Sequence, residues 1–197
     1  MNATSVPAVL RLLLYLLVLG ACSIGLRATY AVAARPSAAS SPRGCLPTRD
    51  GYLRARMRGA RDVEINWDDA DMQCEGGLRP DDVGGLRVTF LGRLSQDGQP
   101  VRMIFGIATA IDAAHVRNVP ANVTVIFEGE TRIYSSAGQD KCTIDELSLQ
   151  PVAEATGAWR RVVARGFCTV PVTAPLGGSG ALEVDRFDFA GGLRNED

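Results

Sequence analysis

The sequence contains a single histidine, His115, and a single lysine, Lys141. Metal sites built from two or three histidines of one chain are therefore excluded by count. A Ser-His-Asp or Cys-His centre needs a histidine that is oriented by a third group and lies beside a nucleophile. No recognisable nucleophile motif surrounds any serine, so we predict no catalytic residue and no cofactor.

Excess charge is also missing, since the formal net charge is −1. Proteins that bind nucleic acid or anionic membranes through electrostatics carry a clear positive excess. The arginines are spread along the whole chain. We therefore expect no nucleic-acid partner, and contact with a membrane only through the N-terminus.

Residues 1–33 have the pattern of an export signal. The first ten residues contain no acid, Arg11 follows, and residues 12–26 are fifteen residues without charge. This length suits the apolar region of a signal peptide, whereas a membrane-spanning helix needs about 20 apolar residues. We predict a hydrophobic targeting helix that exports the protein to the periplasm or the extracellular space.

Three fates of this segment stay open. Residues 31–33 (AVA) fit the small-x-small rule for signal cleavage. Residues 19–22 (LGAC) resemble the lipobox of bacterial lipoproteins, and this four-residue resemblance implies an acylated Cys22 as the first residue of the mature chain. An uncleaved membrane anchor is the third alternative.

The rest of the chain divides into a spacer and a domain. Residues 34–44 (ARPSAASSPRG) are rich in proline, serine and alanine, which is typical of a flexible linker. Residues 45–197 then show the two-residue periodicity of β-strands. We predict that they form one disulfide-bonded β-sandwich domain.

Four cysteines fall within the predicted domain, namely Cys45, Cys74, Cys142 and Cys168. They are too scattered for a zinc site, and an even number is typical of disulfides in an exported protein. Four cysteines allow three pairings. A chain reversal near Ala155, between strands expected at 141–150 and 159–170, favours Cys142 with Cys168 and leaves Cys45 with Cys74.

Residues 53–58 and 63–68 alternate apolar and polar side chains. A turn between them places apolar residues opposite one another and also sets Arg56 opposite Glu64. One register satisfies both faces, as expected for an antiparallel pair.

Further strands are expected at residues 86–90, 101–107, 123–127, 131–134, 141–150, 159–170 and 182–189. Asp97-Gly98 marks a hairpin turn, and the phase slip between Val184 and Phe187 indicates a β-bulge. Residues 108–116 are the one expected helical turn. Together these patterns predict an all-β, antiparallel, two-sheet β-sandwich of about eight or nine short strands.

Two features are candidate ligand sites. Asp68, Asp69 and Asp71 supply the hard oxygen ligands that calcium prefers, although a solvated acidic loop between strands, fixed by Cys74, is the favoured interpretation. Trp159 begins a strand beside arginines and is a candidate for stacking on a ligand, whereas most aromatic residues at strand spacing belong to a core. The arginine row at residues 54, 56 and 58 is either an anion-binding patch or a solvated sheet face.

These observations favour an exported, non-catalytic cell-envelope domain that binds a protein or glycan partner. A secreted hydrolase that uses two carboxylates is one alternative. A calcium-stabilised carbohydrate-binding module is the other.

Overall fold

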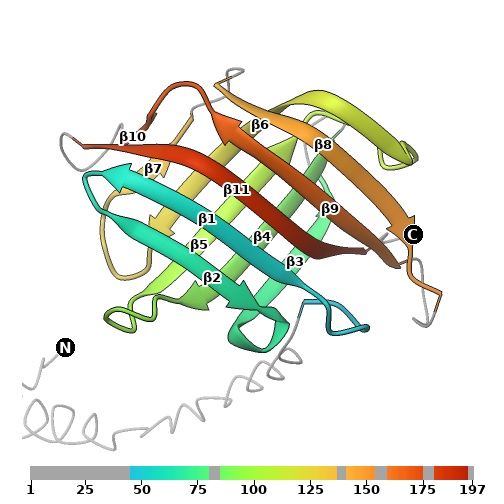
Figure 1. The fold of residues 1–197 in the computed structure, drawn as a ribbon, viewed down its shortest axis with the longest axis horizontal. Coiled ribbons are helices and arrows are strands. Elements are labelled where there is room, and N and C mark those ends of the chain that lie inside the picture. The colour runs from blue at the N-terminus through green and yellow to red at the C-terminus, as the bar shows by residue number, and fades with distance from the viewer. Residues whose placement is uncertain (1–44, 80–84, 137–140, 154–158, 175–179, 195–197) are drawn as a thin grey trace, which may run out of the picture. The chain divides into compact units, whose positions relative to one another are not determined.

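In the computed structural model, the described residues are 45–79, 85–136, 141–153, 159–174 and 180–194. They form an antiparallel all-β fold of eleven strands (Figure 1). The expected all-β, antiparallel class is confirmed, and eleven strands replace the expected eight or nine. The targeting helix, the spacer at 34–44 and Cys22 lie outside the described residues.

The strands are β1 (Tyr52–Gly59), β2 (Val63–Asp68), β3 (Met72–Leu78), β4 (Leu86–Arg93), β5 (Pro100–Ile107), β6 (His115–Phe127), β7 (Ile133–Ser135), β8 (Cys142–Pro151), β9 (Trp159–Cys168), β10 (Val172–Thr173) and β11 (Ala181–Arg194). A short 3₁₀ helix, η2 (Asp69–Asp71), lies between β2 and β3.

The strands lie in two layers (Figure 1). The front layer has the order β2-β1-β11-β9-β8, and the rear layer has the order β3-β4-β5-β6-β7. Backbone pairing also passes between the layers, because β8 pairs with β6 and because β10 pairs with both β7 and β11. All eleven strands therefore share one continuous hydrogen-bonded network.

The β1–β2 hairpin has the predicted register, with Arg56 opposite Glu64. The β4–β5 hairpin turns at Gly98, whose φ of 72° is a conformation that glycine adopts without strain. The predicted bulge is confirmed too, since the β1–β11 register shifts between Arg56 and Met57. The two hairpins and the bulge could be predicted because they depend on the alternation of apolar and polar residues and on the residues at the turns, which can be read from the sequence.

Two expectations about secondary structure were wrong. The helical turn expected at residues 108–116 is absent, because β6 begins at His115 and its first residues pair with β8. The Ala108 N–H donates to the Pro120 carbonyl over 3.0 Å, which joins the loop to the same strand. No strand was expected at residues 72–78, but β3 lies there because β4 supplies a full antiparallel partner.

The space between the layers is filled at its centre by the fully buried rings of Phe90, Phe105, Phe187 and Phe189. Their ring centroids lie 4.5 Å apart for Phe105 and Phe189, and 5.1 Å apart for Phe90 and Phe189. Two of these rings come from the rear layer and two from β11, so the cluster joins the layers. Aromatic pairs at these separations add to the stabilisation from apolar burial.

Side-chain contacts also join the front layer to the rear layer where β2 lies beside β4. The buried Trp67 of β2 donates its indole N–H to the Arg93 carbonyl over 2.8 Å. At the β1–β2 turn, the Arg61 guanidinium lies 4.5 Å from the Phe127 ring centroid and pairs with Glu130. These contacts hold the β1–β2 hairpin against the rear layer.

The structure contains two disulfides, Cys45–Cys74 and Cys142–Cys168, which is the pairing favoured by the sequence. Cys142 lies directly opposite Cys168 in the β8–β9 register. The other bridge fastens the start of the described chain to β3. Two such bridges are typical of proteins that fold in an oxidising environment.

No helix in the described part of the chain is long and apolar enough to cross a membrane.

Candidate functional site

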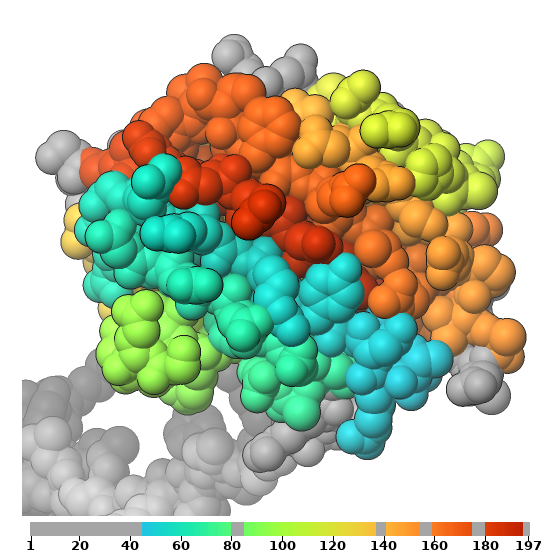
Figure 2. Space-filling view, in the orientation of Figure 1, coloured from blue at the N-terminus to red at the C-terminus, as the bar shows by residue number. Residues whose placement is uncertain are grey.

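Phenyl rings fill the centre between the layers, so we looked for a candidate site on the outer surfaces. The outer side of the front layer carries both acidic and basic side chains, and we call this surface, seen in Figure 2, the front face. It comprises Glu64, Asn66 and Asp68 of β2, Tyr52, Arg54, Arg56 and Arg58 of β1, Asp185, Arg186 and Asp188 of β11, and Trp159, Arg161, Val163, Arg165 and Phe167 of β9.

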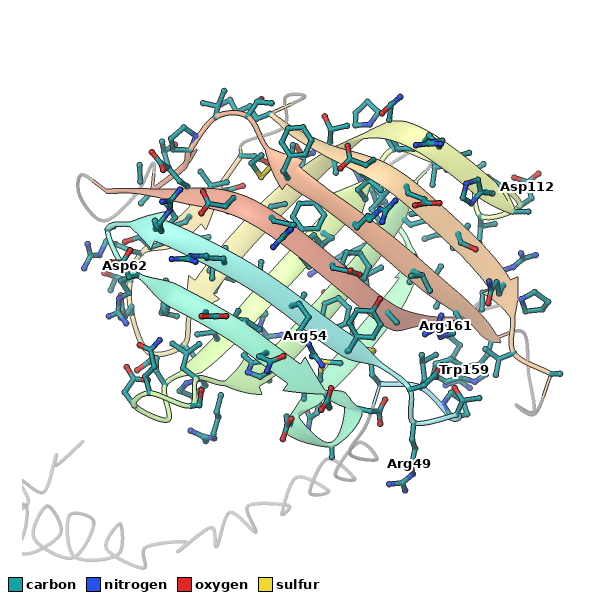
Figure 3. The ribbon with its side chains drawn as sticks, viewed as in Figure 1. Arg49, Arg54, Asp62, Asp112, Trp159 and Arg161 are labelled. Carbon is teal, nitrogen blue, oxygen red and sulfur yellow. A yellow bond between two sulfur atoms is a disulfide. The ribbon has the colours of Figure 1, made fainter. Side chains whose placement is uncertain are left out.

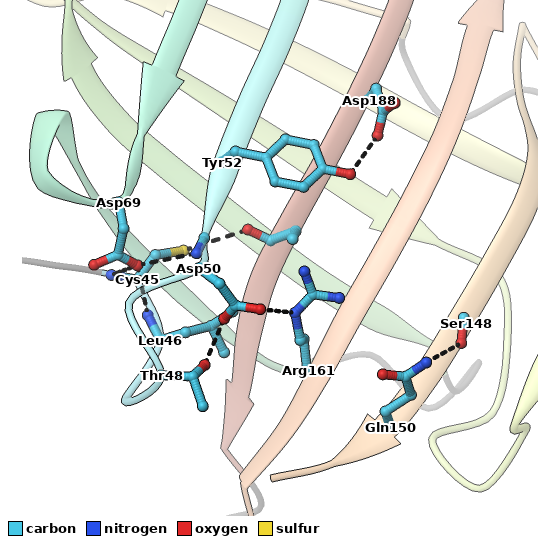
Figure 4. Close-up of polar contacts among 12 residues, drawn as sticks. Cys45, Leu46, Thr48, Asp50, Tyr52, Asp69, Ser148, Gln150, Arg161 and Asp188 are labelled. Carbon is cyan, nitrogen blue, oxygen red and sulfur yellow. Dashed lines mark hydrogen bonds and ion pairs between the residues drawn. The ribbon is translucent and has the colours of Figure 1, made fainter.

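Tyr52 of β1 and Asp188 of β11 form a polar pair on the front face. The Tyr52 hydroxyl donates to the Asp188 carboxylate over 2.8 Å (Figure 4). Partial burial, the hydrogen bond to Asp188 and the negative charge of Asp188 together raise the pKa of Tyr52 to about 12, against the opposing effect of nearby Arg161 and Arg54. The phenol is therefore a neutral donor at physiological pH and is unsuited to act as a base.

Arg161 is held beside this pair by the segment that precedes β1. Its Nε lies 2.9 Å from Asp50, and Asp50 in turn accepts the Thr48 hydroxyl hydrogen bond at 2.5 Å (Figure 4). Asp50 engages the guanidinium only at Nε, and the described residues supply no acceptor for its two terminal amino groups. Arg161 is thus fixed in place while its terminal donors stay available.

Trp159 lies at the start of β9, next to Arg161 (Figure 3). The ring is half-buried, and a side chain at Gly192 would come within 2.7 Å of its Cζ3 atom. Part of the indole therefore packs on the backbone of β11. The ring is partly exposed beside Arg161, whose guanidinium is paired with Asp50 at Nε, and a ligand role for Trp159 stays a hypothesis.

Five other aromatic residues of the domain fall into two groups. Trp67, Phe187 and Phe189 belong to the core, whereas Tyr52 and Phe167 are half-buried on the front face together with Trp159. The front face therefore carries three partly exposed aromatic rings.

The arginine row of β1 is not uniform. Arg54 pairs with Asp68 at 2.5 Å, and its guanidinium lies 5.5 Å from the Tyr52 ring centroid. Arg58 pairs with Asp185 at 2.8 Å, and the hydrogen bond and charge of Asp185 raise the pKa of Arg58. Arg56 differs from both, because it forms no ion pair within the described residues.

The three aspartates considered for calcium bind different partners within the protein. The buried Asp69 accepts the backbone N–H groups of Cys45, Leu46 and Gly51 at 2.9, 3.0 and 3.3 Å. The exposed Asp68 pairs with Arg54, and Asp71 accepts the Asp68 N–H at 3.0 Å. In the ranges that the structure describes, no group of three or more acidic, histidine or cysteine side chains is arranged to hold a metal ion.

No family model, no curated protein and no solved structure matches this chain. The contacts within the molecule are therefore the basis for any functional proposal.

His115 lies on a different part of the molecule, at the start of β6. Its Nε2 is 3.7 Å from Glu146, which forms a closer ion pair with Arg165 at 2.5 Å. Ser148 is opposite His115 in the strand register, but its hydroxyl accepts a hydrogen bond from Gln150, and the described residues show none between Ser148 and His115. This arrangement lacks the nucleophile–base contact that a catalytic triad requires.

Sequence analysis did not identify the Tyr52–Asp188 and Asp50–Arg161 pairs. The two members of the first pair are 136 residues apart in the chain, so no spacing rule connects them. The one available signal was the bulge in the last strand, which changes which residues of β11 face outward.

Proposed function

We propose that this protein is an exported, non-catalytic domain of the cell envelope that binds a protein or glycan partner through its front face. The observation that carries the proposal is the arrangement of Tyr52 and Arg161. Each is held by a carboxylate, from Asp188 and Asp50 respectively, beside the partly exposed ring of Trp159. Aromatic rings beside fixed polar groups are typical of binding surfaces.

Export is supported by the hydrophobic N-terminal segment and by the two disulfides. We interpret the two layers as the sheets of a β-sandwich, an architecture that serves well as a rigid support for a binding surface. The N-terminus would attach the domain to the membrane if Cys22 is acylated or if the targeting segment is not cleaved.

The two alternative functions receive less support. A carboxylate-dependent hydrolase needs a free pair of carboxyl groups about 5–10 Å apart. The two carboxylates beside Tyr52 and Arg161 are already engaged, since Asp188 accepts the Tyr52 hydrogen bond and Asp50 forms an ion pair with Arg161. A calcium-stabilised module would need Asp69, whose Oδ1 already accepts three backbone N–H groups.

The proposal is tested with the mature protein on an array of envelope glycans and in cross-linking to envelope proteins. We expect Tyr52→Ala and Arg161→Gln each to lower affinity for the partner by about tenfold, the loss expected for a central interface residue. Arg87→Gln, which changes an exposed arginine of β4 in the rear layer, is the matched control and should bind like the wild type. Equal binding by all three variants would place the partner elsewhere and contradict the proposal.

A further inference from the structure

The bulge in β11 directs two consecutive side chains to the front face. Arg56 of β1 is opposite Arg186, and the next residue, Met57, is opposite Val184, so Asp185 is the extra residue. Val184 and Phe187 on either side are buried, whereas Asp185 is half-buried and Arg186 is exposed. Bulges commonly redirect side chains in this way, and they are frequent beside functional sites.

The bulge creates a pair of like charges in direct opposition. Arg56 and Arg186 are both exposed and are cross-strand partners. Within the described residues neither forms an ion pair or a side-chain hydrogen bond, although Glu64 is opposite Arg56 on the other side of β1. The pair thus presents two guanidinium groups on neighbouring strands, and no residue that the structure describes supplies a counter-ion to either.

The neighbouring arginines of β1 show that this arrangement is specific to one position. Arg54 and Arg58, two residues away on either side, are both neutralised, by Asp68 and by Asp185. Like charges directly opposite each other across an antiparallel pair are destabilising. The repulsion between Arg56 and Arg186 would be relieved by a bound anion, and guanidinium groups bind carboxylate and phosphate oxygens in a bidentate manner.

We propose that Arg56 and Arg186 form a binding site for the carboxylate or phosphate group of an acidic glycan. This inference rests on the proposed function and specifies the partner. Phe167 supports a glycan in particular, because it follows Gly166, the partner of Phe187 in the β9–β11 register. Continued by one residue, that register puts the half-buried Phe167 ring beside Arg186, where a sugar ring attached to the anion would contact an aromatic surface.

Calorimetric titration of the mature protein tests this site. The probes are a uronate oligosaccharide, an oligosaccharide that carries phosphate, and a neutral oligosaccharide of the same length. We expect at least one acidic probe to bind the wild type, and Arg56→Gln and Arg186→Gln each to weaken that binding by about tenfold, as for loss of one charge-assisted contact. Arg87→Gln removes the same charge from β4 in the rear layer and should stay within about twofold, because Arg87 lies outside the front face.

Thermal unfolding at low salt gives an independent check of the repulsion. Arg186→Gln should raise the melting temperature, and added salt should reduce the gain because it screens the two charges. A lower melting temperature for Arg186→Gln would show that Arg186 stabilises the sheet, and would overturn the proposal.

Further outcomes would also overturn the anion site. The first two are that the wild type binds neither acidic probe, and that Arg186→Gln binds the acidic probe as tightly as the wild type does. The other two are that the wild type binds inorganic phosphate as tightly as the acidic glycan, and that it binds only vesicles that contain anionic lipid. If Arg186→Gln binds normally while Tyr52→Ala and Arg161→Gln do not, the anion site is wrong and the proposed function still holds.

Discussion

Tyr52 is the residue of the front face whose chemistry is altered most by its neighbours. Burial makes the largest contribution to its raised pKa, and the hydrogen bond and charge of Asp188 raise the pKa further. The neutral phenol is favoured in the folded protein, since the folded pKa of about 12 lies above the ordinary value of 10.0. The stabilisation from this pair is therefore present below pH 10 and is lost as the pH rises toward 12.

We predict that Asp188→Asn lowers the pKa of Tyr52, while the value stays above 10.0 because burial remains. Titration of the ¹³Cζ resonance of Tyr52 by NMR across the alkaline range measures this directly. Arg58→Gln changes a charge on the same face without contacting Tyr52 and is the control. An unchanged pKa in Asp188→Asn would mean that the hydrogen bond to Asp188 is not formed in solution.

At the scale of elements, the segment from Cys45 to Gly51 depends on one buried side chain from a different element. The Asp69 carboxylate of η2 accepts three backbone N–H groups of this segment, which also supplies Asp50 to the front face. The Cys45–Cys74 bridge fastens the same segment to β3. Asp69 therefore links the start of the domain to the site, and its role is structural.

Asp69→Ala should lower the free energy of unfolding by about 2–4 kcal/mol, because several buried N–H donors lose their acceptor. Urea denaturation measures the loss, and amide hydrogen exchange should become faster at Cys45, Leu46 and Gly51. Asp62→Ala, which removes an exposed carboxylate next to β2, should change stability by no more than about 0.5 kcal/mol. If the two variants are equally stable, the contacts of Asp69 do not support this segment.

The elements also show what a sequence can and cannot specify. The β1–β2 hairpin was predictable because its alternation and its turn lie within a few residues of each other. Strand β3 was not, because Gly76 and Gly77 interrupt any alternation and the strand is specified by its partner β4. The expected helical turn was wrong for the same reason, since the start of β6 is held by pairing with β8.

At the scale of the whole molecule, the front face is a product of chain topology. It joins Tyr52 from near the start of the domain to Asp188 from near its end, because β11 inserts between β1 and β9. The candidate site could therefore be predicted only in parts: the arginine row, Trp159 and the bulge. Their assembly into one surface required the strand order, which no local pattern contains.

The two disulfides add covalent links to this topology, and the paired cysteines are 29 and 26 positions apart in the sequence. Each bridge should contribute about 2–4 kcal/mol by restricting the unfolded chain. They also carry the argument for export, because such bonds persist outside the reducing cytosol.

The most direct test is mass spectrometry of the mature protein after digestion under non-reducing conditions. We predict one pair of linked peptides that joins Cys142 to Cys168 and another that joins Cys45 to Cys74. Free thiols at these four positions, or a bond between Cys45 and Cys142, would contradict an exported β-domain locked by this pairing.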